Sequence, residues 1–203
     1  MGFGLPAAIL AAWLGTPGQG QSSWIFGAAA SLIGALGVFG LQDAVTFLIA
    51  WEVMSLGGAV MLLGEKLSAD AGEPTLMMLA LLEAGAVALI LAFILIANQA
   101  GSLSFSEFPA AMRALPLWEQ YFVAFLLLAG FGAKLGLLPF YEWFPDAYGV
   151  GSGATGALLS GVVLNAAFFA LSRALVEWLP VRPGGPFPCL ESSSWRSPSQ
   201  APS

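Results

Sequence analysis

The sequence predicts an all-α integral membrane protein, a polytopic transmembrane helical bundle of about five spans in which one helix is broken. Hydrophobic residues make up 58% of the 203 residues and charged residues only 9%, and the mean hydropathy is +0.84. A soluble domain carries roughly 25% charged residues. Residues 1–42, 84–106 and 147–172 are uncharged, and a membrane-spanning helix needs about 20 such residues.

The chain divides by composition into three parts. Residues 1–23 hold a short apolar segment and a polar break, residues 24–178 form the predicted transmembrane domain, and residues 179–203 are rich in Pro and Ser. A segment of that composition buries no core, so we predict that this tail is disordered. It is either a linker or tail, or the product of a reading-frame slip that shortens a longer protein.

Five apolar stretches are predicted to cross the membrane as helices. They are residues 24–40, 41–63, 75–97, 119–138 and 152–178. Residues 64–74 carry several charges and are predicted to form a short loop. Residues 102–117 are too polar to cross the membrane. Apolar side chains recur there at helical spacing, which favours a short helix along the membrane interface; they are Phe105, Phe108, Met112 and Leu115.

The residue types exclude several classes of function. The chain has no His and a single Cys, Cys189, so it offers no disulfide, no haem ligand and no Cys-ligated iron–sulfur site. We therefore predict no cofactor and no metal, and any redox chemistry must belong to a partner. Six basic residues and a net charge of −6 give no patch for nucleic acid.

Lys134 is the most informative residue of the chain, because residues 121–133 before it carry no charge. A lysine at that depth costs about 2.5–3.5 kcal/mol on insertion scales. One interpretation is snorkelling, in which the long stem carries the ammonium to the interface. The other is a broken helix that lines a cavity on a proton or ion path. The predicted helix-break residues are Gly130, Gly132, Gly136 and Pro139.

Glu52 lies at the centre of the second predicted span, and Ser55 is placed one turn later to hydrogen-bond it. The alternative is a carboxylate near a helix end, solvated by lipid headgroups. A carboxylate and a lysine that are each costly alone become less costly when they are paired or bridged by water. We therefore predict that Glu52 and Lys134 face each other inside the bundle, directly or through one water, and gate a proton step.

Two further polar residues inside the spans are assigned to the proton path. Glu83 lies in the third predicted span, where an interfacial or packing role is an equal alternative. Asn165 lies near the middle of the last span, where a simple interhelical hydrogen bond is the alternative.

Three motifs carry a resemblance to a known family: WEVMSL at residues 51–56, GFGAKLGLLPFYEWFPDAY at residues 130–148, and GALLSGVVLNAAFFALSR at residues 156–173. Together they resemble the antiporter-like subunits of respiratory complex I, of Mrp-type cation/proton antiporters and of membrane-bound NiFe hydrogenases. The second motif resembles the broken-helix signature of that family. Details of the second and third motifs lean toward the hydrogenase or formate-hydrogenlyase branch.

The resemblance implies that Glu52 and Lys134 form the ion pair at the entrance of a proton half-channel. It also implies a non-catalytic subunit that works with the lipid bilayer, other membrane subunits and protons or sodium ions, in the inner (cell) membrane of a bacterium or archaeon. The chain departs from the family at Asn165, where relatives commonly hold a second central lysine, and at Tyr148, where they usually hold a histidine. It also matches only the later helices of the first of two inverted repeats.

We therefore predict a proton-translocating membrane subunit, or a fragment of one, in a redox-driven complex of the NADH-quinone oxidoreductase or hydrogenase type. One alternative is a non-transporting membrane scaffold or an inactive truncated fragment, which Asn165 and the missing second repeat favour. A second alternative is an unrelated small-solute transporter. That class would show a discontinuous helix in both halves of a repeat, whereas this sequence shows one break.

Overall fold

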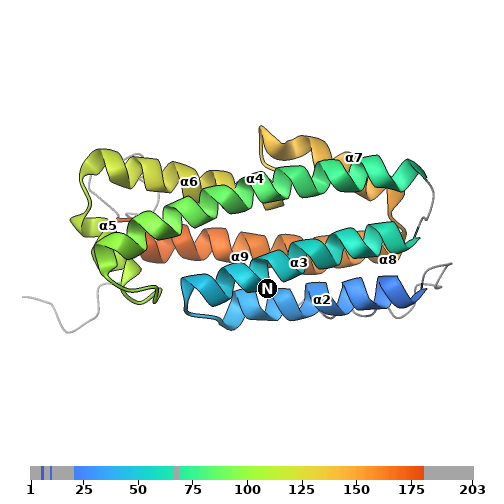
Figure 1. Ribbon diagram of the computed structural model, residues 1–203, viewed down its shortest axis with the longest axis horizontal. Helices are drawn as coiled ribbons and strands as arrows, with labels where there is room; N and C mark the ends of the chain where they lie inside the picture. Colours follow the sequence, from blue (N-terminus) through green and yellow to red (C-terminus); the bar gives the residue numbers. More distant parts are fainter. Residues whose placement is uncertain (1–5, 7–9, 11–20, 66–68, 181–203) are drawn as a thin grey trace, which may run out of the picture.

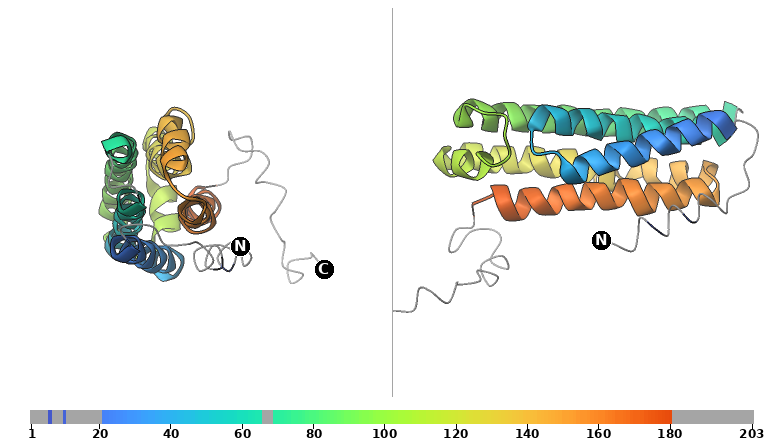
Figure 2. Two further views of the ribbon diagram at one scale, coloured as in Figure 1. Left: turned by 90° about the vertical axis from the view of Figure 1, so that its right-hand side faces the viewer. Right: turned by 90° about the horizontal axis from the view of Figure 1, so that it is seen from below.

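The computed structural model describes Pro6, Leu10, residues 21–65 and residues 69–180. Most of the predicted N-terminal segment and nearly all of the predicted Pro/Ser-rich tail lie outside these residues. Five helical segments of the described part are long and apolar enough to cross a membrane: Ser22–Gly40, Ala44–Gly64, Gly72–Ala100, Leu117–Val150 and Gly153–Trp178. They confirm the predicted all-α bundle of about five spans. The segments run side by side along the long axis of the molecule (Figures 1 and 2).

The helices of the described part follow one another as predicted, with small shifts at their ends. In chain order they are α2 (Gln21–Gly40), α3 (Ala44–Glu65), α4 (Ala69–Ala100), α5 (Phe108–Ala114), α6 (Leu117–Leu135), the 3-10 turn η1 (Phe140–Glu142), α7 (Trp143–Val150), α8 (Gly153–Leu158), the π-helical η2 (Leu159–Leu164), α9 (Asn165–Arg173) and the π-helical η3 (Ala174–Trp178).

Helices α2 and α3 form an antiparallel hairpin whose backbones touch at glycines (Figure 1). A Cβ atom built on Gly34 would lie 2.6 Å from the carbonyl oxygen of Ala50. A Cβ atom on Gly57 would lie 2.6 Å from the backbone nitrogen of Ser31. Small residues of this kind let membrane helices approach closely and replace the hydrophobic effect with van der Waals contact. The hairpin therefore holds α3, and the polar residues on it, in a fixed position.

The predicted loop at residues 64–74 is mostly helical instead. Helix α3 continues to Glu65, α4 begins at Ala69, and Pro74 lies inside α4. Pro74 lies in the second turn of α4, where it removes the backbone hydrogen bond to the carbonyl of the residue four positions earlier, close to the start of the helix. The loop prediction was wrong for residues 64–65 and 69–74, because charged side chains at the solvated ends of a helix do not prevent helix formation.

Helix α5 and the loop before it close one end of the bundle over a cluster of rings. The segment does not cross the bundle, as predicted, and its four apolar side chains are buried in the core. Ring centroids within the cluster lie 4.7 to 5.8 Å apart, and the rings belong to Phe93, Phe105, Phe108 and Trp178. Phe47 extends this cluster toward Trp51, at 5.7 Å between centroids. Edge-to-face packing of this kind stabilises a core beyond the area it buries.

The break in the fourth span lies in the later part of the predicted stretch, at Gly136 and Pro139. Helix α6 stays regular to Leu135 and ends at Gly136, whose φ of +66° lies in the left-handed region that glycine adopts without strain. The N–H of Leu137 then bonds to the carbonyl of Gly132 at 2.9 Å and closes the helix end. Pro139 follows, and η1 and α7 then continue the span toward the end of the bundle where α8 begins.

Two of the four predicted break residues therefore lie inside regular helix. Gly130 permits close packing rather than a break, because a Cβ atom there would lie 2.9 Å from the carbonyl oxygen of Gly85 and 2.4 Å from Cγ of Leu89 on α4. Gly132 is buried in α6 and contributes its carbonyl to the helix end described above. Gly136 and Pro139 are the residues that stand at the break.

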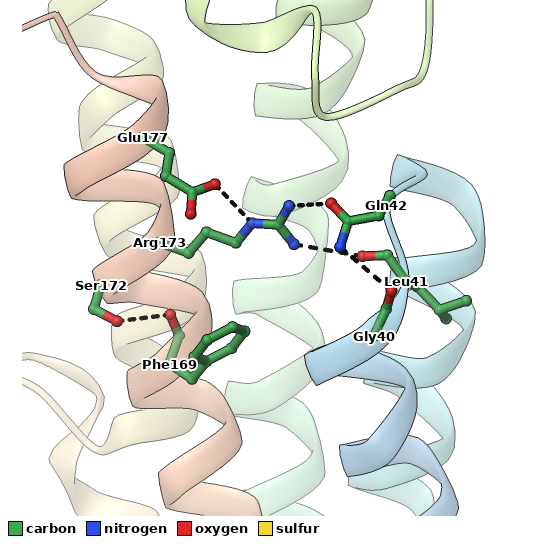
Figure 3. Close-up of polar contacts among 7 residues, drawn as sticks. All are labelled: Gly40, Leu41, Gln42, Phe169, Ser172, Arg173 and Glu177. Atoms are coloured by element: carbon green, nitrogen blue, oxygen red, sulfur yellow. Dashed lines mark hydrogen bonds and ion pairs between the residues drawn. The ribbon is translucent and has the colours of Figure 1, made fainter. Parts of the chain in front are cut away.

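Arg173 ties the end of α9 to the turn between α2 and α3 (Figure 3). Its guanidinium donates to Oε2 of Glu177 at 2.9 Å, to the side-chain oxygen of Gln42 and to the carbonyl of Leu41 at 3.5 Å. Its Cζ also lies 5.2 Å from the ring centroid of Phe105. These contacts anchor the last span against the hairpin that carries Glu52.

Candidate functional site

Lys134 is enclosed by the bundle near the end of α6. Its side chain is 1% exposed, so the ammonium does not snorkel to the membrane interface. Nζ donates to the carbonyl oxygen of Trp51 at 2.8 Å and to the hydroxyl of Ser55. Nζ also lies 3.9 Å from the centroid of the Trp51 ring, within the range of a cation–π contact. We call the Trp51 carbonyl, the Trp51 ring and the Ser55 hydroxyl the lysine seat.

One turn of α3 supplies the whole lysine seat. Ser55 follows Trp51 by four residues, so both residues lie on one face of the helix. The Ser55 hydroxyl donates to the Trp51 carbonyl at 3.1 Å and therefore presents its lone pairs to Lys134. The predicted hydrogen bond from Ser55 to Glu52 is not formed. Serine inside a helix commonly donates a hydrogen bond to the carbonyl four residues earlier, and Ser55 does so here.

The helices around the break hold Lys134 in register with the lysine seat. The indole N–H of Trp143, the first residue of α7, donates to the carbonyl of Ala133 at 2.9 Å. The Phe131 ring packs edge-on against Trp51, with 5.3 Å between centroids. Both contacts flank Lys134 in the sequence and fix the last turn of α6 against α3 and α7.

Two carboxyl groups lie beside the lysine seat. Glu52 of α3 is half-buried and Glu83 of α4 is exposed. Their side chains are close enough to interact with each other. Both carboxyl groups act electrostatically on Lys134. Helices α3, α4 and α6 thus bring together one basic and two acidic side chains in apolar surroundings.

Glu52 and Lys134 are neighbours, but they do not form a direct ion pair in this structure. Nζ of Lys134 is bonded to Trp51 and Ser55, and Oε1 of Glu52 is buried without a hydrogen-bond partner. The ion pair found in the described residues joins Arg173 and Glu177 instead. The direct contact allowed by the sequence prediction is therefore absent, and the water-bridged contact stays a prediction.

Asn165 does not join this cluster through any hydrogen bond. Its side-chain N–H groups donate to the carbonyls of Ser160 at 3.3 Å and Gly161 at 3.0 Å, on its own helix. These carbonyls belong to η2, where π-helical geometry displaces the regular bonding pattern. The hydroxyls of Tyr148 and Ser160 are 2.7 Å apart. The two positions that depart from the family pattern, Tyr148 and Asn165, therefore meet at Ser160.

The cluster around Lys134 has the chemistry of a proton site. Carboxylates accept a proton, a hydroxyl accepts and donates one, and an ammonium donates. Ionisable groups buried at membrane depth mark ion and proton pathways by default, because they are too costly to keep otherwise. Within residues 21–65 and 69–180, no three side chains of His, Cys, Asp or Glu lie close enough together to hold a metal ion.

Sequence reasoning found Glu52 and Lys134 but missed the lysine seat. The acceptor on Trp51 is a backbone carbonyl, which has no residue signature. The sequence predicts a hydrogen bond from Ser55 to Glu52, whereas Ser55 bonds to Trp51 and Lys134. The spacing of four residues between Trp51 and Ser55 was the usable signal, because it places a hydroxyl over the carbonyl of the preceding turn.

The chain is similar in sequence to a family of membrane proteins. Residues 42–183 match the sequence model of the family described as NADH:quinone oxidoreductase/Mrp antiporter, TM. This range contains all four residues assigned to the proton path. Hydrogenase-4 component B of Escherichia coli K12 is 32% identical over 143 residues, which is 68% of this chain. An NAD(P)H-quinone oxidoreductase chain 4 of Thermosynechococcus vestitus is 31% identical over 183 residues, or 88% of this chain.

A solved structure shares both the fold and the sequence pattern. The match is to a chain of the membrane-bound sulfane sulfur reductase, an archaeal respiratory membrane complex, with a TM-score of 0.68 and 31% identity over 86% of this chain. The matched part is a minor share of each relative. It spans 20% of the Escherichia coli protein, 33% of the cyanobacterial protein and 27% of the archaeal chain.

Proposed function

Because the chain belongs to the NADH:quinone oxidoreductase/Mrp antiporter transmembrane family, we propose that it translocates protons as a membrane subunit, or a fragment of one, in a redox-driven complex of the NADH-quinone oxidoreductase or hydrogenase type. The observation that carries the proposal is the burial of Lys134 beside Glu52 and Glu83. A scaffold has no use for three ionisable groups held together at membrane depth, each of which is costly there.

The proposed mechanism uses these three side chains as a gate. The carboxyl pair of Glu52 and Glu83 shares a proton, and the position of the Lys134 ammonium controls how readily that proton is held. When the ammonium approaches, both carboxylates are stabilised in their charged forms and the proton moves on. When it withdraws to the lysine seat, the pair takes up a proton again. Redox chemistry in another subunit supplies the driving force, and sodium is the alternative ion.

The exposure of Glu83 supports the proposal that this chain packs against other membrane subunits. Its side chain is exposed on α4, and residues 76–97 of this span are otherwise apolar. An exposed carboxyl in hydrocarbon is costly, so we propose that a neighbouring membrane subunit or helix covers this face, while lipid contacts the remaining apolar surface.

A non-transporting scaffold is the second candidate, and Asn165 favours it. An amide does not take up and release protons in the physiological range, and this amide is bonded to its own helix. A path that runs from Lys134 toward Asn165 would end there. Membership of the family argues against the unrelated small-solute transporter considered from the sequence.

Substitution of the gate residues tests the proposal. In vesicles that hold the assembled complex, we expect Glu52→Gln and Lys134→Met each to lower proton translocation by about tenfold or more, since stranding one partner of a buried charge pair costs about 3–5 kcal/mol. The double substitution should lose much less than the product of the two single effects, because neither charge is then left without its partner.

The matched control is Glu142→Gln, which neutralises an exposed carboxylate next to the break. It should assemble and translocate protons like the unaltered protein. Normal translocation by both gate variants at normal levels of assembly would contradict the proposed function and leave the scaffold as the remaining reading.

A further inference from the structure

The resting position of Lys134 is unexpected for an ammonium with two carboxyl groups nearby. Glu52 and Glu83 both attract it, yet its hydrogen bonds go to a backbone carbonyl and a hydroxyl on α3. Neutral acceptors compete with a carboxylate only when they are fixed in place before the ammonium arrives. The lysine seat meets this condition because both of its residues are buried and joined by their own hydrogen bond.

We infer that Ser55 is a positioning residue that divides Lys134 between two sites, the lysine seat and the carboxyl pair of Glu52 and Glu83. This inference deepens the proposed function and rests on it. The residues of the seat, Trp51 and Ser55, lie on either side of Glu52 in the sequence of α3, so the two sites adjoin each other, and we propose that the long lysine side chain moves between them.

Ser55 is the adjustable part of the lysine seat. The Trp51 carbonyl is backbone and cannot be removed by a side-chain change, and the Trp51 ring also supports the aromatic core through Phe47 and Phe131. The Ser55 hydroxyl donates a hydrogen bond to the Trp51 carbonyl and accepts one from Lys134. Without it, the ammonium keeps a single oxygen acceptor in the seat, and the balance shifts toward the carboxyl pair.

Solid-state NMR on the full chain in lipid bilayers measures this balance directly. The chain has two lysines, Lys66 and Lys134, so Lys66→Arg leaves one labelled side-chain ammonium. With ¹⁵N at lysine Nζ, and ¹³C at either the tryptophan carbonyl or the glutamate carboxyl carbon, the unaltered protein should show a strong Nζ coupling to tryptophan carbonyl and a weak one to carboxyl. Ser55→Ala should reverse the order of the two couplings.

A second buried serine, Ser31, provides the control, and a threonine at position 55 provides the rescue. Ser31→Ala removes another buried helix hydroxyl, which donates to the Met54 carbonyl at 3.1 Å and does not contact Lys134. It should leave both couplings unchanged. Ser55→Thr keeps a hydroxyl that can bond the carbonyl four residues earlier and should restore the original order. Couplings that are the same in Ser55→Ala and the unaltered protein would overturn the inference, as would a dominant carboxyl coupling in the unaltered protein.

Transport by the assembled complex separates this inference from the proposed function. Ser55→Ala should slow proton translocation by about tenfold, the effect of losing one hydrogen bond to a charged group, whereas Ser31→Ala should not slow it beyond any loss of assembled protein. If the two serine variants behave alike while Glu52→Gln and Lys134→Met are impaired, the inference fails and the proposed function stands. If the gate variants translocate normally, the proposed function fails whatever the couplings show.

Discussion

At the scale of single residues, the charged side chains that are costly inside a membrane lie together around Lys134. Charged side chains inside apolar runs are visible in a sequence because each is expensive, and this made Glu52 and Lys134 predictable. What could not be predicted was the acceptor of the Lys134 ammonium. The Trp51 carbonyl is separated from it by 83 residues, and backbone atoms look alike in every residue. Only the packing of α6 on α3 decides which carbonyl the ammonium meets.

Trp143 is the residue whose substitution should loosen this site without touching its charges. Its indole N–H bonds to the carbonyl of Ala133, next to Lys134, and its side chain is 1% exposed. We expect Trp143→Phe to lower the free energy of unfolding by about 1–2 kcal/mol, from the lost hydrogen bond and the smaller ring. Thermal or denaturant unfolding in detergent would measure it.

Trp118→Phe is the matched control for Trp143→Phe. Trp118 lies on the same fourth span, but its side chain is 69% exposed. Its replacement should change the free energy of unfolding by less than about 0.5 kcal/mol, as is usual for exposed positions. Equal effects of the two substitutions would show that the bond from Trp143 to Ala133 contributes nothing to the fold.

At the scale of elements, the five spans were predictable because each is an apolar stretch of membrane length, and hydropathy reports length and apolarity directly. The sequence also predicted a break in the fourth span, but not which of the four named residues make it. Glycine ends a helix only where the backbone adopts positive φ, and a sequence does not distinguish that use from close packing. Gly136 takes the first role and Gly130 the second, because Gly130 faces Gly85 on α4. The π-helical turns around Asn165 likewise had no sequence signal.

The hairpin of α2 and α3 gives a prediction about these packing glycines. Gly34→Ala should lower the free energy of unfolding by about 1–3 kcal/mol, the cost of overpacking, because the added methyl group meets the Ala50 carbonyl and the Met54 backbone nitrogen, each at 2.6 Å. The control on the same helix is Gly40→Ala, where nothing lies within 4 Å of the added atom. If unfolding of the two variants in detergent takes place at the same midpoint, the hairpin is less tightly packed than its backbone contacts indicate.

At the scale of the whole molecule, the spans present a continuous apolar surface to their surroundings. Each contributes large exposed hydrophobic side chains within the span, and examples from successive spans are Ile33, Ile49, Ile94, Phe125 and Phe168. A surface of this kind is stable in lipid and not in water. The polar ends of the bundle lie beyond it, with α5 at one end and the start of α8 at the other (Figure 1).

This arrangement predicts which positions are open to water and from which side. In a Cys189→Ser background, which removes the single native cysteine, a membrane-impermeant thiol reagent should label Ser106→Cys and Gly153→Cys from opposite sides of the membrane. Both positions are exposed and lie at opposite ends of the bundle. Ile94→Cys and Phe168→Cys, inside the third and fifth spans, should resist the aqueous reagent because lipid or a neighbouring subunit covers them.

The two arginines of the described helices assign the sides. Arg113 on α5 and Arg173 on α9 lie at the same end of the bundle as Ser106, and the positive-inside rule places such an end in the cytoplasm. Ser106→Cys should therefore react in inverted vesicles and stay protected in intact cells, with Gly153→Cys showing the reverse. Labelling of both from one side, or rapid aqueous labelling of Ile94→Cys and Phe168→Cys, would contradict the five-span arrangement, because one crossing, the span Leu117–Val150, separates Ser106 from Gly153.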